Sequence, residues 1–146
     1  MNDQPTPAPR LEDYPHRVTD TIRFGDLDPQ GHVNNAVIAT YFEAGRVAMF
    51  RQPDLSIGVP GVTFVLVHTE INYLQELRWP GTVDVGSVIA RFGRTSFKVD
   101  HAVFKDGVCA ATGSATMVAI DKESRRARPL PEEMIAKLSP WQRPGM

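Results

Sequence analysis

The stretch that decides the fold is residues 34–52, NNAVIATYFEAGRVAMFRQ. On a helix with about 3.6 residues per turn, its apolar side chains cover more than one face, and its polar side chains fill only part of the circumference. This pattern is typical of a buried helix. At about 1.5 Å per residue such a helix is about 28 Å long, and Pro53 marks its end. The sequence therefore predicts one long central helix over about residues 34–52.

The segment just before this helix, residues 23–35 (RFGDLDPQGHVNN), concentrates polar side chains in a tight turn. It carries Asp26, Asp28, His32, Asn34 and Asn35, together with a proline and two glycines that suit sharp bends. A helix N-terminus offers unpaired N–H groups and the positive end of the helix dipole. A carboxylate beside such amides suits acyl chemistry, so this turn is the candidate site.

The rest of the chain has mainly the pattern of strands. Extended segments are predicted at 14–24, 62–76, 82–92, 96–104 and 108–120, and a short second helix at 131–138. The Asp-Gly pair at 106–107 is a strong hairpin signal. Successive strands beside one helix predict an α+β fold with an antiparallel sheet of about five strands. The sheet must be curved, because a flat sheet cannot cover a buried helix.

Size and composition limit the class of protein. The 146 residues suit one domain, expected over residues 14–138, with a disordered leader at 1–13 and a loose tail at 139–146. The net charge of −1 gives no broad basic surface for nucleic acid, and no apolar run is long enough to cross a membrane. The polar N-terminal residues lack the apolar segment of a signal peptide, which predicts a cytoplasmic protein.

The sequence predicts neither a metal site nor a cofactor. Its four histidines show no paired ligand spacing, and Cys109 is the single cysteine, so no cysteine metal cluster or internal disulfide can form. Cys109 lies among small strand residues and is interpreted as a core residue. No serine lies in a Gly-x-Ser-x-Gly elbow, so a Ser-His-Asp hydrolase is not supported.

Several motifs are similar to those of one known family. These motifs are RFGDLDP (23–29), GHVNN (31–35), YFEAGR (41–46), Pro-Gly (80–81), GRTS (93–96) and Leu-Pro (130–131). Together they resemble the hotdog-fold acyl-CoA thioesterases of the 4-hydroxybenzoyl-CoA thioesterase type, and the resemblance extends from about residue 17 to residue 134. The resemblance implies a curved sheet wrapped around the central helix and a cytoplasmic, metal-free hydrolase of acyl-CoA thioesters. It also implies a homodimer whose sheets pair edge to edge, often a dimer of dimers, with active sites at the dimer interface.

The resemblance also implies roles for residues of the turn. Asp28 matches the catalytic carboxylate, and the backbone amide of Asn35 matches the group that polarises the thioester carbonyl. His32, Asn34 and Asn35 stand where the 4-hydroxybenzoyl enzyme carries apolar and aromatic residues, which favours fatty or general acyl thioesters. From the residues alone, Asp26 is a turn former, Asn34 is a helix cap or a substrate contact, and His32 is catalytic or fixes the turn.

Thioester hydrolysis needs stabilisation of an oxyanion and activation of water, whereas a thiol leaving group with a pKa near about 8.5 needs little acid catalysis. Asp28 is expected to act as general base, or as a nucleophile that forms a mixed anhydride; the sequence leaves both routes open. Glu43 on the helix is a weaker candidate, because its spacing from Arg46 is that of a helical ion pair. Candidate partners of the CoA phosphates are Arg91, Arg94, Lys98, Arg125, Arg126 and Arg128.

Two other functions remain open on this sequence. One is a non-catalytic acyl-CoA-binding or sensor protein on the same fold, and the other is a hotdog hydratase. The spacing between Asp28 and His32 does not match the separated His and Asp of such hydratases. The acyl group is not determined, since the pocket depends on the directions of side chains such as Tyr41, Phe64 and Tyr73.

Overall fold

The described residues form one curved sheet and two α-helices. A computed structural model describes residues 8–51 and 59–144 of the chain. The elements in these ranges are β1 (His16–Thr21), α1 (Asn35–Phe50), β2 (Val62–Tyr73), β3 (Thr82–Phe92), β4 (Ser96–Lys105), β5 (Val108–Asp121) and α2 (Glu132–Leu138). Short 3-10 turns occur at Leu11–Asp13, Phe24–Asp26 and Ser139–Trp141. Neither of the two α-helices in the described ranges has the length and apolar character needed to cross a bilayer.

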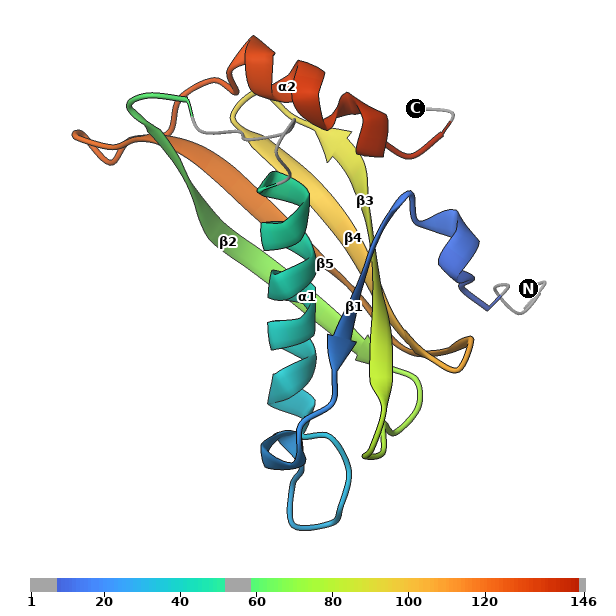
Figure 1. Ribbon diagram of the computed structural model, residues 1–146. Coiled ribbons are helices and arrows are strands. Elements are labelled where there is room, and N and C mark those ends of the chain that lie inside the picture. The colour runs from blue at the N-terminus through green and yellow to red at the C-terminus, as the bar shows by residue number, and fades with distance from the viewer. Residues whose placement is uncertain (1–7, 52–58, 145–146) are drawn as a thin grey trace, which may run out of the picture.

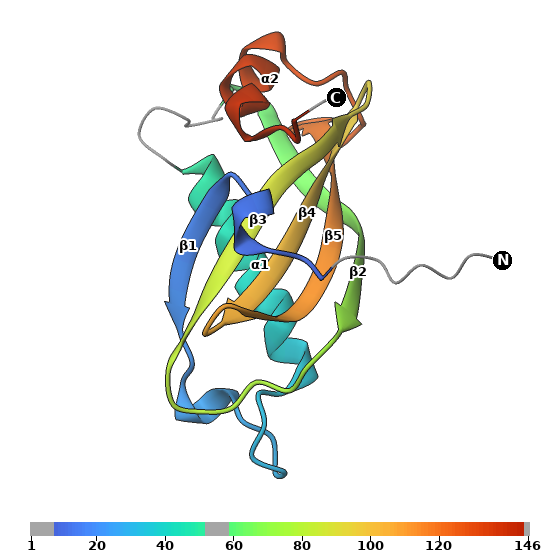
Figure 2. The same cartoon turned by 90° about the vertical axis from the view of Figure 1, so that its right-hand side faces the viewer.

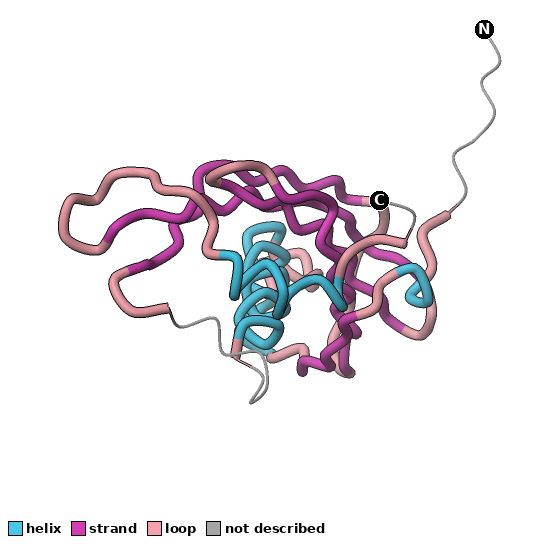
Figure 3. Tube along the Cα trace, turned by 90° about the horizontal axis from the view of Figure 1, so that it is seen from above, coloured by secondary structure: helices cyan, strands magenta, loops and turns pink. Residues whose placement is uncertain are grey.

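The strands form a single antiparallel sheet in the order β1-β3-β4-β5-β2. The β4–β5 hairpin turns at Asp106 and Gly107, whose φ angles of 51° and 80° match the Asp-Gly signal. The sheet curls around α1, which runs along its concave side (Figure 1, Figure 2). Figure 3 shows the same arrangement from above, with the sheet bent over the helix. The prediction of an α+β fold with a curved five-stranded sheet and one long helix is confirmed.

The helix α1 contacts the sheet through one face only. Its buried residues recur at helical spacing, and they are Ile38, Tyr41, Phe42, Gly45, Arg46 and Met49. On the opposite face Ala36, Ala39 and Glu43 are exposed. The prediction that the helix is buried on most sides is therefore wrong for the single chain. Much of its apolar character comes from alanine, which favours helices but loses little free energy when it is exposed.

Two groups of core side chains fix α1 at its two ends. Near the helix start, Ile22, Val33, Ile38 and Leu77 belong to one buried cluster. Near the helix end, Met49 packs in a second cluster that includes Phe97 of β4 and the apolar face of α2. Because Ile22 follows β1, Val33 precedes α1 and Leu77 follows β2, the first cluster ties the turn before α1 to two other parts of the chain.

Two strands end earlier than their sequence patterns predict. β1 ends at Thr21 rather than at residue 24, because residues 24–26 form a 3-10 turn. β2 ends at Tyr73 rather than at residue 76, because the following residues leave the sheet to meet the turn before α1. Gln52, the last residue of the predicted helix, lies outside the described residues.

The described parts of both chain ends are held against the sheet. Gln142 forms a parallel bridge with Ile89, and Arg143 Nη2 lies 2.8 Å from Asp100 Oδ2. Leu11 packs against a buried cluster on the outer side of the sheet. The prediction of a loose tail is therefore wrong for residues 139–144, and the prediction of a disordered leader is wrong for residues 8–13. The rest of the two predicted segments, residues 1–7 and 145–146, lies outside the described ranges.

Candidate active site

The turn before α1 is closed by backbone hydrogen bonds and by Asp26. The N–H of Asp28 donates to the carbonyl of His32 at 2.8 Å, and the N–H of Asn34 donates to the carbonyl of Asp26 at 2.8 Å. Oδ2 of Asp26 accepts from the Arg23 N–H at 2.8 Å and from the Tyr41 hydroxyl at 3.1 Å. Burial and the Asp26 carboxylate both raise the pKa of Tyr41, so its hydroxyl stays protonated and donates. Asp26 therefore holds the loop, as the sequence predicts.

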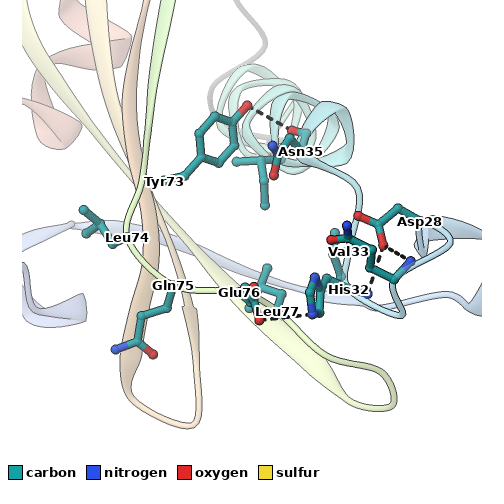
Figure 4. Close-up of a pocket in the computed structure, with 11 residues that line it drawn as sticks. Asp28, His32, Val33, Asn35, Tyr73, Leu74, Gln75, Glu76 and Leu77 are labelled. Carbon is teal, nitrogen blue, oxygen red and sulfur yellow. Dashed lines mark hydrogen bonds and ion pairs between the residues drawn. The ribbon is translucent and has the colours of Figure 1, made fainter.

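Asp28 has one carboxylate oxygen fixed by its own turn. Oδ1 accepts the N–H of Gln30 at 2.9 Å and the N–H of His32 at 3.2 Å. Across the described part of the chain, Oδ2 accepts no hydrogen bond, and it faces the start of α1 (Figure 4). The carboxylate is thus oriented by two amides while one oxygen stays available to a water or an acyl carbon.

The first turn of α1 leaves one backbone donor available. Asn34 is the N-cap: its Oδ1 accepts the Ala36 N–H at 2.9 Å, and its carbonyl accepts the Val37 N–H at 2.9 Å. Its interpretation as a helix cap is confirmed, whereas a substrate contact by Asn34 stays a prediction. In the described ranges the N–H of Asn35 donates to no acceptor. The predicted donor to the thioester oxygen is therefore the uncommitted amide of this helix start.

The segment after β2 lies against the turn. The Val33 N–H donates to the Leu77 carbonyl at 2.9 Å, and His32 forms an isolated antiparallel bridge with Arg78. This contact brings Nε2 of His32 to 3.1 Å from Oε2 of Glu76. Glu76 was not predicted from the sequence, because an isolated glutamate near the end of a predicted strand carries no motif.

These side chains border one pocket of about 290 Å³. Figure 4 shows it between the turn, the start of α1 and the end of β2. Its lining residues are Asp28, Gln30, His32, Val33, Asn35, Ile38, Tyr73, Leu74, Gln75, Glu76 and Leu77. The pocket therefore combines two carboxylates, an imidazole and a free amide with apolar side chains such as Val33 and Leu77.

Of the three side chains expected to shape an acyl pocket, only Tyr73 lines this one. The hydroxyl of Tyr73 donates to the carbonyl of Asn35 at 3.2 Å, which ties β2 to the helix start. Tyr41 is buried and bound to Asp26, and it does not line this pocket. Phe64 packs against Phe97 in the distant core cluster, with ring centroids 5.7 Å apart.

The predicted CoA-binding cations do not meet Asp28 within one chain. Arg91, Arg94 and Lys98 belong to the β3–β4 hairpin, which lies beside α2, and the turn with Asp28 lies at the opposite end of the sheet (Figure 1). Nζ of Lys98 is 3.9 Å from Oδ1 of Asp100. Their role in binding CoA stays a prediction.

The two competing candidates for the reacting group lie outside the pocket. Glu43 is on the exposed face of α1. Burial raises the pKa of the Cys109 thiol, which disfavours the thiolate that a cysteine nucleophile needs. Within residues 8–51 and 59–144, no group of three or more His, Cys, Asp and Glu side chains is arranged to hold a metal ion.

A curved antiparallel sheet wrapped around one long helix defines a hotdog-fold protein. Residues 22–138 match the family model of the thioesterase-like superfamily. The 1,4-dihydroxy-2-naphthoyl-CoA hydrolase of Synechococcus elongatus is 26% identical over an alignment of 118 residues, and the match covers 77% of this chain and 87% of the relative. The chain therefore belongs to the thioesterase-like superfamily, and the prediction of a thioesterase is confirmed at this level.

Solved structures agree with this assignment. A thioesterase from Thermus thermophilus, complexed with coenzyme A and Zn, is 37% identical, with a TM-score of 0.75 and coverage of 87% of this chain and 93% of that one. The PA5185 protein from Pseudomonas aeruginosa strain PAO1 is 26% identical, with a TM-score of 0.85 and coverage of 96% and 100%. The likeness extends over nearly the whole chain, so the fold is that of these proteins.

Proposed function

We propose that this protein hydrolyses acyl-CoA thioesters to a free carboxylic acid and CoA, with Asp28 as the reacting carboxylate. The observation that carries the proposal is that Asp28 and Asn35, whose N–H is uncommitted, line the same pocket. A thioester carbonyl placed between them has its oxygen near an amide donor and its carbon near a carboxylate. Amides at a helix N-terminus stabilise developing negative charge without reorganising during the reaction.

Both chemical routes start from this arrangement. In the general-base route, Asp28 takes a proton from water, the water oxygen bonds to the acyl carbon, and collapse of the oxyanion breaks the C–S bond. In the nucleophilic route, Oδ2 of Asp28 bonds to the acyl carbon, the CoA thiolate leaves, and water then hydrolyses the mixed anhydride. In both routes the thiolate leaves without a strong acid, since the pKa of a thiol is only about 8.5.

The proposal includes a homodimer, assembled further into a dimer of dimers. β2 forms one edge of the sheet, and its backbone is paired with β5 on one side only. Exposed apolar side chains follow this edge and its continuation: Leu66, Val67, Tyr73 and Leu74. An edge strand of this length with apolar side chains favours pairing with another strand. Light scattering from the purified protein measures the mass, and a monomer at micromolar concentration would contradict this part.

The acyl group is proposed to be a fatty or general acyl chain, and the location cytoplasmic. Thiol release from a panel of acyl-CoAs of increasing chain length tests the substrate class. The panel should contain aromatic acyl-CoAs as well, because one relative is a 1,4-dihydroxy-2-naphthoyl-CoA hydrolase. Crotonyl-CoA belongs in it too, since hydration without thiol release would identify a hydratase.

The decisive variant is Asp28→Asn, which retains an oxygen acceptor for the two turn amides but loses the charge. We expect kcat to fall about 10²- to 10⁴-fold. Asp106→Asn is the matched control, because asparagine tolerates the positive φ of 51° at that turn position. Full turnover by Asp28→Asn on every acyl-CoA that the native protein hydrolyses would refute the assignment. Tight acyl-CoA binding by the native protein without thiol release would identify a binding or sensor protein instead.

A further inference from the structure

The pocket contains a second carboxylate, Glu76, that contacts His32 rather than the place proposed for the thioester. Oε2 of Glu76 is 3.1 Å from Nε2 of His32, and the His32 side chain is only 19% exposed. Figure 4 shows the imidazole lying between Glu76 and the turn that carries Asp28. The contact is a hydrogen bond if Nε2 carries a proton.

The contact with Glu76 favours a proton on Nε2 of a neutral imidazole. A carboxylate only accepts hydrogen bonds, and a neutral imidazole has one N–H and one acceptor nitrogen. With the proton on Nε2, Nδ1 becomes the acceptor. In the part of the chain that the structure describes, Nδ1 of His32 has no hydrogen-bond partner. A lone pair in a pocket with Asp28 is therefore available to a bound water.

Arg78 favours the opposite tautomer. Its Nη2 lies 3.5 Å from Nε2 of His32 and 3.4 Å from Oε2 of Glu76. A guanidinium only donates, so it could bond Nε2 only if the proton were on Nδ1. Oε2 of Glu76 lies within reach of both Arg78 Nη2 and His32 Nε2, and it favours the Nε2–H tautomer because a carboxylate only accepts. Without Glu76, Arg78 is the neighbour that remains to select the tautomer.

The backbone, rather than a loose surface contact, sets the position of Glu76. Exposed ion pairs between long side chains are commonly weak and mobile. Here the residues on both sides of the contact are bridged, because His32 pairs with Arg78 and the Val33 N–H donates to the Leu77 carbonyl. Leu77, the next residue after Glu76, is buried in the cluster at the helix start.

We propose that Glu76 is a positioning residue that holds the proton of His32 on Nε2, so that Nδ1 accepts a hydrogen bond from the attacking water. In the general-base route the water then gives its other proton to Asp28. In the nucleophilic route the water oxygen bonds to the acyl carbon of the mixed anhydride, the bond between that carbon and Asp28 breaks, and the departing Asp28 carboxylate takes the proton. His32 gains no net proton in this step. The inference rests on the proposed thioester hydrolysis and adds Glu76 to its machinery.

The test combines kinetics with a readout that does not depend on turnover. In Glu76→Ala, Arg78 is left to donate to Nε2, and we expect kcat to fall on the order of 10- to 100-fold, with little change in KM. In ¹⁵N-histidine NMR of the protein without substrate, at about pH 8.5 where a histidine is ordinarily neutral, the His32 signals should move from the Nε2–H to the Nδ1–H pattern. His32→Ala assigns these signals.

Two further variants separate positioning from a general loss of structure. Glu133→Ala is the matched control, because Glu133 is an exposed glutamate that pairs with Lys137 on α2 at 3.1 Å. It should leave kcat and the His32 signals unchanged. In a His32→Ala background, Glu76→Ala should cause no further loss of kcat, because Glu76 acts through His32.

The outcomes distinguish this inference from the function on which it rests. An unchanged tautomer in Glu76→Ala, an unchanged kcat, or full additivity with His32→Ala each overturns the role of Glu76. If Asp28→Asn loses activity in the same experiments, hydrolysis through Asp28 still stands. If instead Asp28→Asn keeps full turnover, the proposed function fails, whatever the histidine signals show.

Discussion

Replacing Asn35 with proline tests the proposed amide donor while the helix start is retained. Asn35 is the first residue of α1, and in the described ranges its N–H donates to no acceptor. Proline lacks this N–H and is favoured at the first helical position, where no intrahelical hydrogen bond is lost. The preceding residue, Asn34, has a ψ of 136°, within the range that a following proline requires. We therefore expect Asn35→Pro to fold as the native chain does.

The expected loss is catalytic rather than structural. Removing one donor from an oxyanion site typically lowers kcat about 10²- to 10³-fold, which is about 2.7–4 kcal/mol of transition-state stabilisation. The hydrogen bond from the Tyr73 hydroxyl to the carbonyl of residue 35, at 3.2 Å, is retained, because proline keeps its carbonyl. The melting temperature should therefore stay within about 4 °C of the native value, the shift that corresponds to about 1 kcal/mol.

The assay is thiol release at saturating concentration of the acyl-CoA that the native protein hydrolyses fastest. Asn35→Ala is the control, since it removes the side chain and keeps the N–H, and we expect a kcat near the native value. Near-native kcat in folded Asn35→Pro would show that this amide does not stabilise the transition state. An equal loss in Asn35→Ala would assign the effect to the side chain instead.

Two further predictions concern the buried contact between α1 and the sheet. Burial lowers the pKa of His101 well below 6.5, so in acid the unfolded chain takes up a proton that the native ring does not. The free energy of unfolding should therefore decrease below about pH 6.5, by up to about 1.4 kcal/mol per pH unit. Denaturant titrations should show that the unfolding free energy of His101→Gln depends less steeply on pH. In Gly45→Ala the new Cβ lies 2.9 Å from Ser87 Oγ. This close contact should lower the free energy of unfolding, measured by denaturant titration, by about 1–3 kcal/mol. Gly25→Ala is the control and should lower it less, because there is open space around its Cβ.

The fold was predictable because its strongest signals are local. The apolar helix, the Asp-Gly turn and the β-branched segments each depend on a few consecutive residues, and their order alone gives a curved antiparallel sheet around one helix. α1 is less buried than its apolar composition predicts, because many of its apolar residues are alanines, which are tolerated on an open face. The held residues 139–144 were missed because their contacts, such as Gln142 with Ile89, join distant parts of the chain.

The grouping of the candidate site residues was predictable where they come from one turn. Asp28, His32 and Asn35 are brought together by a short loop, so their spacing in the sequence already limits their distances. Glu76 reaches His32 only through the pairing of residues far apart along the chain, and no local pattern carries that information. The contact becomes visible once the bridge between His32 and Arg78 is known.

The direction of β3 separates the predicted CoA cations from the pocket of their own chain. β3 starts beside the turn, where the Ile22 N–H donates to the Gly81 carbonyl at 2.9 Å, and runs away from it. At about 3.3 Å per residue, Arg91 lies about 30 Å farther along the sheet. Arg94 therefore lies at the end opposite the pocket of its own chain.

In the proposed dimer, the cations of one copy would lie at the pocket end of the other copy. β2 runs from the α2 end of the sheet to the pocket, which its last residue, Tyr73, lines. If two copies pair through β2 about a two-fold axis, their β2 strands run in opposite directions, because a two-fold axis perpendicular to the strands reverses them. The α2 end of one copy then lies beside the pocket end of the other. In the proposed dimer, Arg94 of the partner subunit would lie at the end where Asp28 of the first copy lines the pocket. The acyl group and the CoA phosphates would then be bound by different copies of the chain.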